Sequence, residues 1–368
     1  ISLDKAKNSS YLQDKRVLIT GAGGSIGSEL CRQVANFRPD KLILFENAET
    51  PLFHIEQELI AAYPDIHIVP IIGDVRHRSR VVSIFDEQLP EVVFHAAAYK
   101  HVPMMELNPA EAVNNNINGS RIVADAAHAF GVDTFVMIST DKAVRPTNVM
   151  GVSKRISELY VQALSKESKT RFVTTRFGNV LGSNGSVIPT FQEQIKAGGP
   201  VTVTDPEVTR FFMTIAEAAQ LVLQAGCMGQ GGEIFLFDMG EPVRIVHLAE
   251  ELIRLSGLRP YEDIEISFTG LRPGEKLHEE LLLADEGTLS THHEKICIAK
   301  SSVQSRIMLI AEIDKLVDSA KKLDFDAVKI GLRKLVPEYM PDNERPRAKI
   351  IPYPSVSLGK IESTRFRG

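Results

Sequence analysis

The sequence predicts an α/β protein built on a Rossmann-like, doubly wound parallel sheet, with a smaller C-terminal α/β domain that binds the substrate. Short apolar segments alternate with helical patterns through the first half of the chain, which is typical of a parallel sheet covered on both faces. The first apolar segment, 16–20, runs directly into the glycine-rich turn 21–27 and a helical pattern over 28–37. After residue 178 the expected elements become shorter and less regular, which indicates a second part.

The elements are expected in the following order. The apolar segments predict strands at 16–20, 41–45, 66–72, 92–96, 135–138 and 172–177. The helical patterns predict helices at 28–37, 52–63, 79–89, 109–130, from 150 onward, 187–197, 307–323 and 325–335. The predicted division is a lead-in without an element (1–15), a Rossmann-like domain (16–178), a mainly substrate-binding part (179–340) and a tail (341–368), with a strand at 233–238 returning to the first sheet.

Composition argues against several classes of protein. With 368 residues, 43% of them hydrophobic, the chain can bury a large core. A formal net charge of −5 argues against a nucleic-acid or anionic-membrane surface, since either needs a concentrated basic face. Three widely spaced cysteines, Cys31, Cys227 and Cys297, favour a reducing compartment, and the histidines lack metal-ligand spacing. No apolar run approaches the roughly 20 residues of a membrane helix, and no signal peptide is apparent.

The glycine turn predicts a dinucleotide site. Gly21, Gly24 and Gly27 allow a tight turn, close approach of the backbone to a pyrophosphate, and close packing of the following helix. The second predicted strand ends at Glu46, where an acid would bind the adenosine ribose hydroxyls. Because this acid would also repel a 2′-phosphate, we expect NAD rather than NADP.

Two further strand ends are expected beside the cofactor. Asp74, followed by Val75, closes the third strand and is placed either at the adenine amino group or as an ordinary helix N-cap. Ala96, Ala97 and Ala98 follow the fourth strand and are small enough for a cofactor to lie against their backbone.

The polar run after the predicted strand 135–138 contains the residues expected to take part in the reaction. Thr140, Asp141 and Lys142 stand at the end of a buried strand, where ligands bind in open α/β sheets. A helix opens about ten residues later and places Lys154 one turn in. On this stretch alone, a solvated turn before a helix is an equal alternative.

Several motifs resemble the extended short-chain dehydrogenase/reductases. They are T-G-x-x-G-x-x-G from Thr20, H-A-A-A from His95, N-I-N-G from Asn116, and the helix lysine Lys154. Longer runs are similar to the membrane-associated UDP-N-acetylglucosamine 4,6-dehydratases of bacterial surface-glycan and glycoprotein pathways. These runs are A-A-Y-K-H-V-P from Ala97, S-T-D-K-A-V-R-P-T-N from Ser139, R-F-G-N-V-L-G-S-N-G-S-V-I-P from Arg176 and L-R-P-G-E-K-L-H-E-E-L from Leu271.

One position departs from the superfamily pattern. Met150 stands where Tyr-x-x-x-Lys would have its tyrosine, and a thioether cannot exchange a proton. The only tyrosine with a lysine four residues on is Tyr11, which precedes the first strand. The dehydratase group is similar in tolerating methionine here, yet the departure leaves open a protein that binds nucleotide without turning it over.

The resemblance implies roles for further residues. It adds Ser25, Ile26, Asn116 and Lys154 to the cofactor site. The implied substrate site comprises Lys100, Asn179, Val187, Ile188, Thr202, Arg210, Arg272 and Glu275. In this family the matching arginines and asparagine contact the nucleotide diphosphate, the Val187–Ile188 pair the uracil, and the glutamate the ribose. Taken singly, either arginine could instead form a surface ion pair.

The expected function is NAD-dependent 4,6-dehydration of UDP-N-acetylglucosamine to UDP-2-acetamido-2,6-dideoxy-hexos-4-ulose. Lys142 is expected as the base at C5, Asp141 as the acid at the C6 oxygen, and Thr140 as the partner of the C4 oxygen. The acceptor of the C4 hydroxyl proton is either Asp141 or a water held by Thr140. The alternatives are a UDP-sugar 4-epimerase and a catalytically inactive nucleotide-binding protein. The resemblance also implies a homo-oligomer that faces the cytoplasm and reaches the membrane only through a segment absent from this chain.

Overall fold

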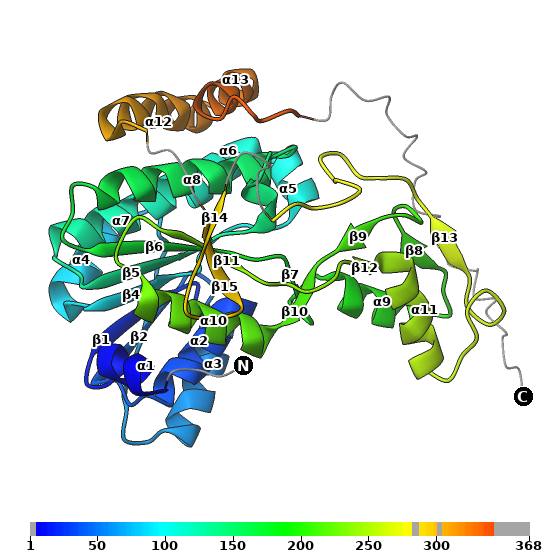
Figure 1. The fold of residues 1–368 in the computed structure, drawn as a ribbon, viewed down its shortest axis with the longest axis horizontal. Helices are drawn as coiled ribbons and strands as arrows, with labels where there is room; N and C mark the ends of the chain where they lie inside the picture. The colour runs from blue at the N-terminus through cyan, green and yellow to red at the C-terminus, as the bar shows by residue number, and fades with distance from the viewer. Residues whose placement is uncertain (1–4, 282–286, 300–303, 342–368) are drawn as a thin grey trace, which may run out of the picture.

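A computed structural model describes residues 5–281, 287–299 and 304–341, and its centre is a nine-stranded sheet (Figure 1). The strands are β1 (Arg16–Thr20), β2 (Lys41–Glu46), β3 (His67–Ile72), β4 (Val92–His95), β5 (Thr134–Ile138), β6 (Arg171–Arg176), β11 (Ile234–Phe237), β14 (Thr288–Ser290) and β15 (Ile296–Ala299). Their order is β14-β15-β11-β6-β5-β4-β1-β2-β3. All neighbours from β3 to β11 are parallel, whereas β15 and β14 are antiparallel additions. The order 3-2-1-4-5-6 is that of a doubly wound Rossmann sheet, so the predicted fold class is correct.

Helices cover both faces of this sheet. One face carries α1 (Lys5–Leu12), α2 (Ser25–Ala35), α3 (Glu49–Ala62) and α10 (Ile215–Met228). The other carries α4 (Arg78–Gln88), α5 (Val102–Leu107), α6 (Pro109–Glu111), the π-helical segment η1 (Ala112–Gly119), α7 (Ser120–Ala129) and α8 (Val149–Ser165). A further layer, α12 (Arg306–Lys321) and α13 (Phe325–Leu335), covers α8 from outside (Figure 1). Every position from 149 to 164 is therefore buried, and α8 is a fixed platform for its side chains.

The expectation of a lead-in without structure was wrong for part of residues 1–15. Lys5–Leu12 form α1, because Tyr11 and Leu12 bury against α10. The Tyr11 hydroxyl donates to the Leu223 carbonyl at 2.8 Å. Two apolar residues are too short a pattern to predict such a helix. The expected tail lies outside the described residues beyond 341.

A smaller lobe, residues 187–210 and 243–281, stands beside the sheet (Figure 1). It contains α9 (Val187–Lys196), β8 (Val201–Val203), β9 (Thr209–Arg210), β12 (Val243–Arg244), α11 (Ile245–Leu255) and β13 (Ile266–Phe268). Its own apolar core includes Phe191, Ile253 and Ile266. The paired strands β7 (Asn179–Leu181) and β10 (Phe212–Thr214) connect it to the sheet.

The remaining elements between residues 179 and 340 pack with the large sheet. They are α10, β11, β14, β15, α12 and α13. The smaller lobe therefore contains only part of the 179–340 segment. Among the described helices none is both long and apolar enough to cross a membrane.

Candidate active site

A cleft of about 890 Å³ opens where the carboxyl ends of β4 and β5 and the glycine turn face the smaller lobe. Most residues expected at the site line it: Gly24, Ser25, Ile26, Ala96, Ala98, Lys100, Thr140, Lys142, Met150, Lys154, Asn179, Val187, Thr202, Arg210, Arg272 and Glu275. A second cleft of about 270 Å³ adjoins it across Gly24 and Ala96 and contains the expected adenosine end: Gly21, Glu46, Asp74, Val75 and Ala97. Four expected residues line neither cleft: Gly27, Asn116, Asp141 and Ile188.

Two glycines of the turn, Gly21 and Gly27, lie where a side chain would collide with backbone atoms. Gly21 has φ +69°, and a Cβ there would lie 2.7 Å from the Ala97 nitrogen. At Gly27 a Cβ would lie 1.9 Å from the Gly21 carbonyl oxygen. Gly27 therefore acts by letting α2 begin close to the turn, which explains why it lies outside the cleft.

Glu46 and Asp74 lie in the smaller cleft with different partners. Glu46 accepts backbone N–H groups from Gly23 at 2.9 Å, Asn47 at 2.9 Å and Ala48 at 3.0 Å. Asp74 accepts the Arg76 N–H at 2.8 Å and pairs with the Arg76 guanidinium at 2.7 Å. Burial acts to raise the pKa of Asp74, but the bonds from Arg76 outweigh it and lower the pKa. The N-cap of α4 is His77, so the alternative of Asp74 as that cap is wrong.

Asn116 supports the wall of the cleft from behind. Its side chain is completely buried on η1, accepts the Tyr99 N–H at 2.8 Å, and donates to the Tyr99 carbonyl at 2.9 Å and the Ser153 hydroxyl at 2.9 Å. It thus fixes the chain after Ala98 against α8. An uninterrupted helix was expected over 109–130, but the structure has π-helical turns at η1 within this range. Such turns are frequent at functional sites.

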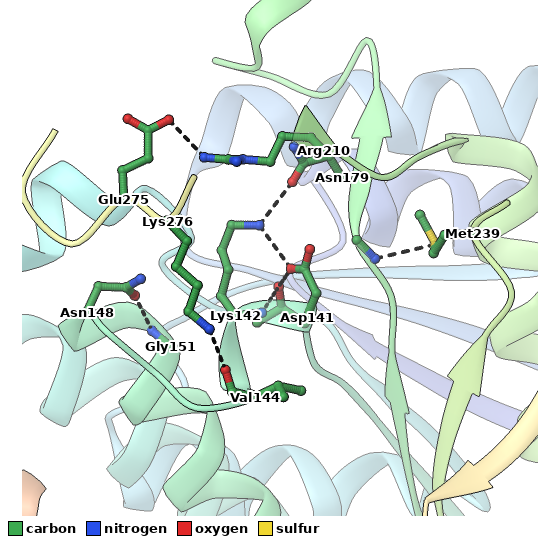
Figure 2. Close-up of polar contacts among 12 residues, drawn as sticks. Asp141, Lys142, Val144, Asn148, Gly151, Asn179, Arg210, Met239, Glu275 and Lys276 are labelled. Atoms are coloured by element: carbon green, nitrogen blue, oxygen red, sulfur yellow. Dashed lines mark hydrogen bonds and ion pairs between the residues drawn. The ribbon is translucent and has the colours of Figure 1, made fainter. Parts of the chain in front are cut away.

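The residues expected to carry the chemistry lie in η2 (Asp141–Ala143) and at its N-cap Thr140, directly after β5 (Figure 2). The Thr140 hydroxyl donates to Asp141 Oδ1 at 2.8 Å, and Lys142 Nζ donates to the same oxygen at 2.9 Å. Lys142 Nζ also donates to Asn179 Oδ1 at 3.0 Å. Thr140 and Lys142 face the cleft, whereas Asp141 is completely buried behind them. Asp141 can therefore exchange protons with a ligand only through these two neighbours.

The pKa values of the three lysines that line the cleft are shifted in different directions. Burial acts to lower the pKa of Lys142, but Asp141 and Glu279 outweigh it and raise the pKa. Burial lowers the pKa of Lys154 to about 8, against the opposing charge of Glu158. Burial and then the charge of Lys142 lower the pKa of Lys100. The resting ion pair thus holds Lys142 as an ammonium, as expected from its neighbour Asp141.

A buried ionic layer lies beneath these groups. Glu158 accepts two bonds from the Arg176 guanidinium, at 2.8 and 2.7 Å, and one from the Ser139 hydroxyl at 2.7 Å. Burial acts to raise the pKa of Glu158, but Arg176, Arg155 and Ser139 lower it to about 2. Because Glu158 is one helical turn after Lys154, this layer places a permanent negative charge under the lysine.

The smaller lobe contributes a second set of charges. The Arg210 guanidinium is held by the carbonyls of Thr209 at 2.7 Å and Leu277 at 3.2 Å, and pairs with Glu275 at 2.9 Å (Figure 2). Arg272 lines the same part of the cleft, and no protein partner of its guanidinium is found in the described ranges. Both arginines of the expected diphosphate clamp therefore line the cleft. The Arg210 guanidinium is bonded to protein groups, whereas that of Arg272 has no protein partner in the described ranges.

The other residues expected at the substrate do not all line the cleft. Val187 and Thr202 line the cleft, and the Thr202 hydroxyl accepts a bond from Gln194 at 2.7 Å. Ile188 is half-buried away from the cleft wall. Asn179, implied at the diphosphate, is bonded to Lys142 in the free protein.

Sequence reasoning missed two charged residues of the segment 271–281. Lys276 Nζ donates to the Val144 carbonyl at 2.9 Å, which ties this segment to the loop after η2 (Figure 2). Glu279 is buried, and burial raises the pKa of its carboxyl group against the opposing charge of Lys142. Both lie in a loop about 130 residues from η2, so no periodicity could have revealed the contact.

The chain was compared with known proteins. The family model described as polysaccharide biosynthesis protein matches residues 17–301, which is most of the chain. The chain belongs to the polysaccharide biosynthesis protein family. It is 55% identical over 316 residues to the capsular polysaccharide biosynthesis protein CapD of Staphylococcus aureus, covering 85% of this chain and 53% of CapD. The chain thus spans about half the length of this relative.

Other relatives are named for their activities. A UDP-N-acetylglucosamine 4,6-dehydratase (inverting) of Campylobacter jejuni is 34% identical over 295 residues, covering 79% of this chain and 84% of that protein. A UDP-glucose 4-epimerase of Rickettsia bellii is 36% identical over 285 residues, which cover 74% of this chain and 79% of that protein. The solved structure of Pen from Bacillus thuringiensis superposes with a TM-score of 0.73 at 37% identity, covering 80% of this chain and 92% of Pen. The relatives of this chain thus include proteins named for 4,6-dehydration and for 4-epimerisation.

Proposed function

We propose that this polysaccharide biosynthesis protein is a nucleotide-sugar 4,6-dehydratase that uses NAD and acts on UDP-N-acetylglucosamine. The observation that carries the proposal is the Thr140–Asp141–Lys142 group, in which an amine and a hydroxyl face the cleft and share one buried carboxylate. A 4-epimerase needs only to oxidise and reduce C4, so it has no use for a base-and-acid pair. Elimination of water between C5 and C6 needs both.

The residues present fit a bound NAD. The contact distances at Gly21 and Gly27 leave the turn free for a pyrophosphate, at the N-terminus of α2. Glu46 lies in the adjoining cleft, where its carboxylate can accept ribose hydroxyls and would repel a 2′-phosphate. Lys154 would hold the ribose next to the nicotinamide. A dinucleotide held by these residues would supply hydride transfer for oxidation at C4 and reduction at C6, with no net redox change.

The smaller lobe fits a sugar nucleotide. Arg210 and Arg272 would bind the diphosphate, since guanidinium groups match phosphate oxygens bidentately. On binding, Arg210 would exchange its bond to Glu275 for the phosphate, which frees Glu275 for the uridine ribose. Val187 and Thr202 line the remaining wall toward the base.

The proton steps follow from which groups face the cleft. Lys142, as the free amine, takes the C5 proton and later returns it to C5. The C4 hydroxyl proton passes through the Thr140 hydroxyl to Asp141, and the same route delivers a proton to the departing C6 oxygen. One proton from C4 thus leaves in the water, and all protons balance. Asp141 acts through Thr140 because it is buried behind it.

Mass spectrometry tests this function directly. Incubation with UDP-N-acetylglucosamine should yield a nucleotide sugar lighter by one water, with the uridine diphosphate intact. An epimerase would leave the mass unchanged, and a nucleotide-binding protein would leave the sugar unchanged; either result would exclude the proposal. N-acetylglucosamine 1-phosphate, which lacks the second phosphate and the uridine, should not be converted if the arginine clamp supplies the binding.

A further inference from the structure

One short segment, 272–276, contacts both walls of the cleft. On the side of the smaller lobe, Glu275 pairs with Arg210 at 2.9 Å. On the other side, the Gly274 carbonyl accepts a bond from the Asn148 side-chain amide at 2.9 Å, in the loop that precedes α8. Two consecutive residues of the segment are therefore bonded to the two parts of the molecule that enclose the cleft.

The contact at Gly274 is close and has two donors. Besides the Asn148 amide, the Thr147 hydroxyl donates to the Gly274 carbonyl at 3.0 Å. Gly274 has φ +76°, and a Cβ there would lie 2.6 Å from the Asn148 Cβ. A side chain at 274 would therefore push the segment away from the loop, so this approach requires glycine.

Asn148 is also the N-cap of α8. Its Oδ1 accepts the Gly151 N–H at 2.7 Å (Figure 2). An N–H can only donate and a carbonyl can only accept, so the two bonds together fix the orientation of the amide group. At Gly151 a Cβ would lie 2.1 Å from the Lys142 carbonyl oxygen, so the first turn of α8 packs directly on the backbone of η2. Contacts thus run without a gap from Glu275 through Asn148 to Lys142.

Such a path matters because the substrate has two ends. Under the proposed function the diphosphate binds Arg210 and Arg272, while C5 and C6 of the hexose must lie against Lys142. Binding energy from a remote part of a substrate raises turnover when it holds the reacting atoms in place. A misplacement of about 1 Å can lower the rate by about a hundredfold, so the distance between the arginines and the base must be fixed.

We propose that Asn148 is a positioning residue that, together with the Thr147 hydroxyl, holds the diphosphate-binding segment at a fixed distance from Lys142. This inference rests on the proposed function and adds to it how the nucleotide end of the substrate is aligned with the base. Asn148 is 2% exposed and lines neither of the two clefts, so it touches no ligand itself. It acts on the segment through Gly274 and on the base through the start of α8.

The kinetic test removes the two donors one at a time. Thr147→Val removes the hydroxyl and keeps the shape of the side chain. Asn148→Ser keeps an oxygen for the N-cap, where serine and asparagine are equally favoured, but removes the amide donor. Each variant should lower kcat roughly 3- to 10-fold, and the double variant on the order of 30- to 100-fold.

Binding of UDP alone separates positioning from damage to the fold. Its dissociation constant, measured by calorimetry, should stay within about twofold of the wild-type value, because Arg210 and Arg272 belong to the lobe and are unchanged. Asp324→Ser is the matched control: it makes the same kind of N-cap exchange at α13, where Asp324 accepts the Ala327 N–H at 3.0 Å, and should change neither quantity. A double variant with wild-type kcat would overturn the proposal, and so would one whose UDP affinity falls as much as its kcat.

Hydrogen exchange tests the same tie without catalysis. In wild-type protein with NAD, UDP should slow amide exchange in peptides that cover 143–151, because ordering of the segment is passed to the N-cap of α8. In the double variant UDP should still slow exchange in α9 but no longer in 143–151. If UDP protects 143–151 equally in both proteins, or in neither, the tie does not exist. If the wild type shows this protection but does not convert UDP-N-acetylglucosamine, the proposed function fails while the tie stands.

Discussion

The two walls of the cleft recognise ligands by different means. The cofactor wall is formed largely by backbone: Gly21 and Gly27 have no room for a Cβ, and the Glu46 carboxylate is held by three backbone N–H groups. The opposite wall consists of charged side chains that bond to one another in the free protein, as in the pairs Lys142–Asp141 and Arg210–Glu275. A ligand entering the first wall meets a shape already formed. A ligand entering the second must replace existing ion pairs.

This difference separates retention of the cofactor from turnover of the substrate. A backbone cradle loses no ion pairs when the dinucleotide binds, so the cofactor can stay through successive cycles. Under the proposed function, each substrate molecule would replace ion pairs of the charged wall and so change the charge around Lys142. Substitutions in the two walls should therefore move different observables.

The largest effect is expected on the charged wall, from Lys142→Ala. Removal of the base should lower turnover by roughly 10²–10⁴-fold and abolish exchange of the C5 hydrogen with deuterated solvent, while the NAD content of the purified protein stays that of the wild type. Lys196→Ala, at an exposed lysine of α9, is the control and should change neither. Exchange at the wild-type rate in Lys142→Ala would show that another group is the base.

Gly27→Ala tests the backbone wall. Its Cβ would lie 1.9 Å from the Gly21 oxygen, so the turn must shift. Overpacking of this kind costs on the order of 3 kcal/mol, which corresponds to roughly hundredfold weaker NAD binding, measured by titration of the cofactor-free protein. Gly24→Ala is a graded comparison, because its Cβ would lie 3.2 Å from the same oxygen and needs only a small adjustment. Equal affinities in the two variants would contradict the steric argument.

The sequence predicted the backbone wall better than the charged wall, because the former is local. The strand, the turn and α2 are consecutive, and Glu46 ends the adjacent strand, so their relation follows from the βαβ connection. The run Thr140–Lys142 was equally local and its position at a strand end was predictable. The loop that packs against it was not predictable: Lys276, which donates to the Val144 carbonyl just after η2, comes from a distant segment without periodicity.

The same contrast explains the errors in the fold. α1 is held by Tyr11 and Leu12 against α10, more than 200 residues away, so the local pattern gives no signal. The resemblance implied both Val187 and Ile188 at the uracil, and this stays a prediction. In the structure Val187 lines the cleft and Ile188 does not, since consecutive helical residues point about 100° apart.

Thr140→Val sharpens the comparison within the charged wall. It removes the hydroxyl that links the cleft to Asp141 at 2.8 Å but keeps the shape of the side chain. A hydrogen bond to a charged group contributes about 1.5–3 kcal/mol, so turnover should fall roughly 10- to 150-fold. Thr140→Ser, which retains the hydroxyl, should recover most of this loss. A Val variant with wild-type turnover would show that the C4 proton leaves by another route, such as a bound water.

The smallest effect is expected from Met150→Tyr. Met150 is 3% exposed at the cleft wall, on the fixed platform of α8, where the superfamily pattern has a tyrosine. If Thr140 and Asp141 already accept the C4 proton, an added phenol supplies nothing that the reaction lacks, and overpacking of about 1–3 kcal/mol should offset any gain. Met150→Phe matches the size without the hydroxyl, so the ratio of turnover between the two variants isolates the phenol and should stay within about tenfold. A ratio of several orders of magnitude in favour of tyrosine would mean that Met150 marks a disabled position, and that the charged wall lacks the proton acceptor assigned to it.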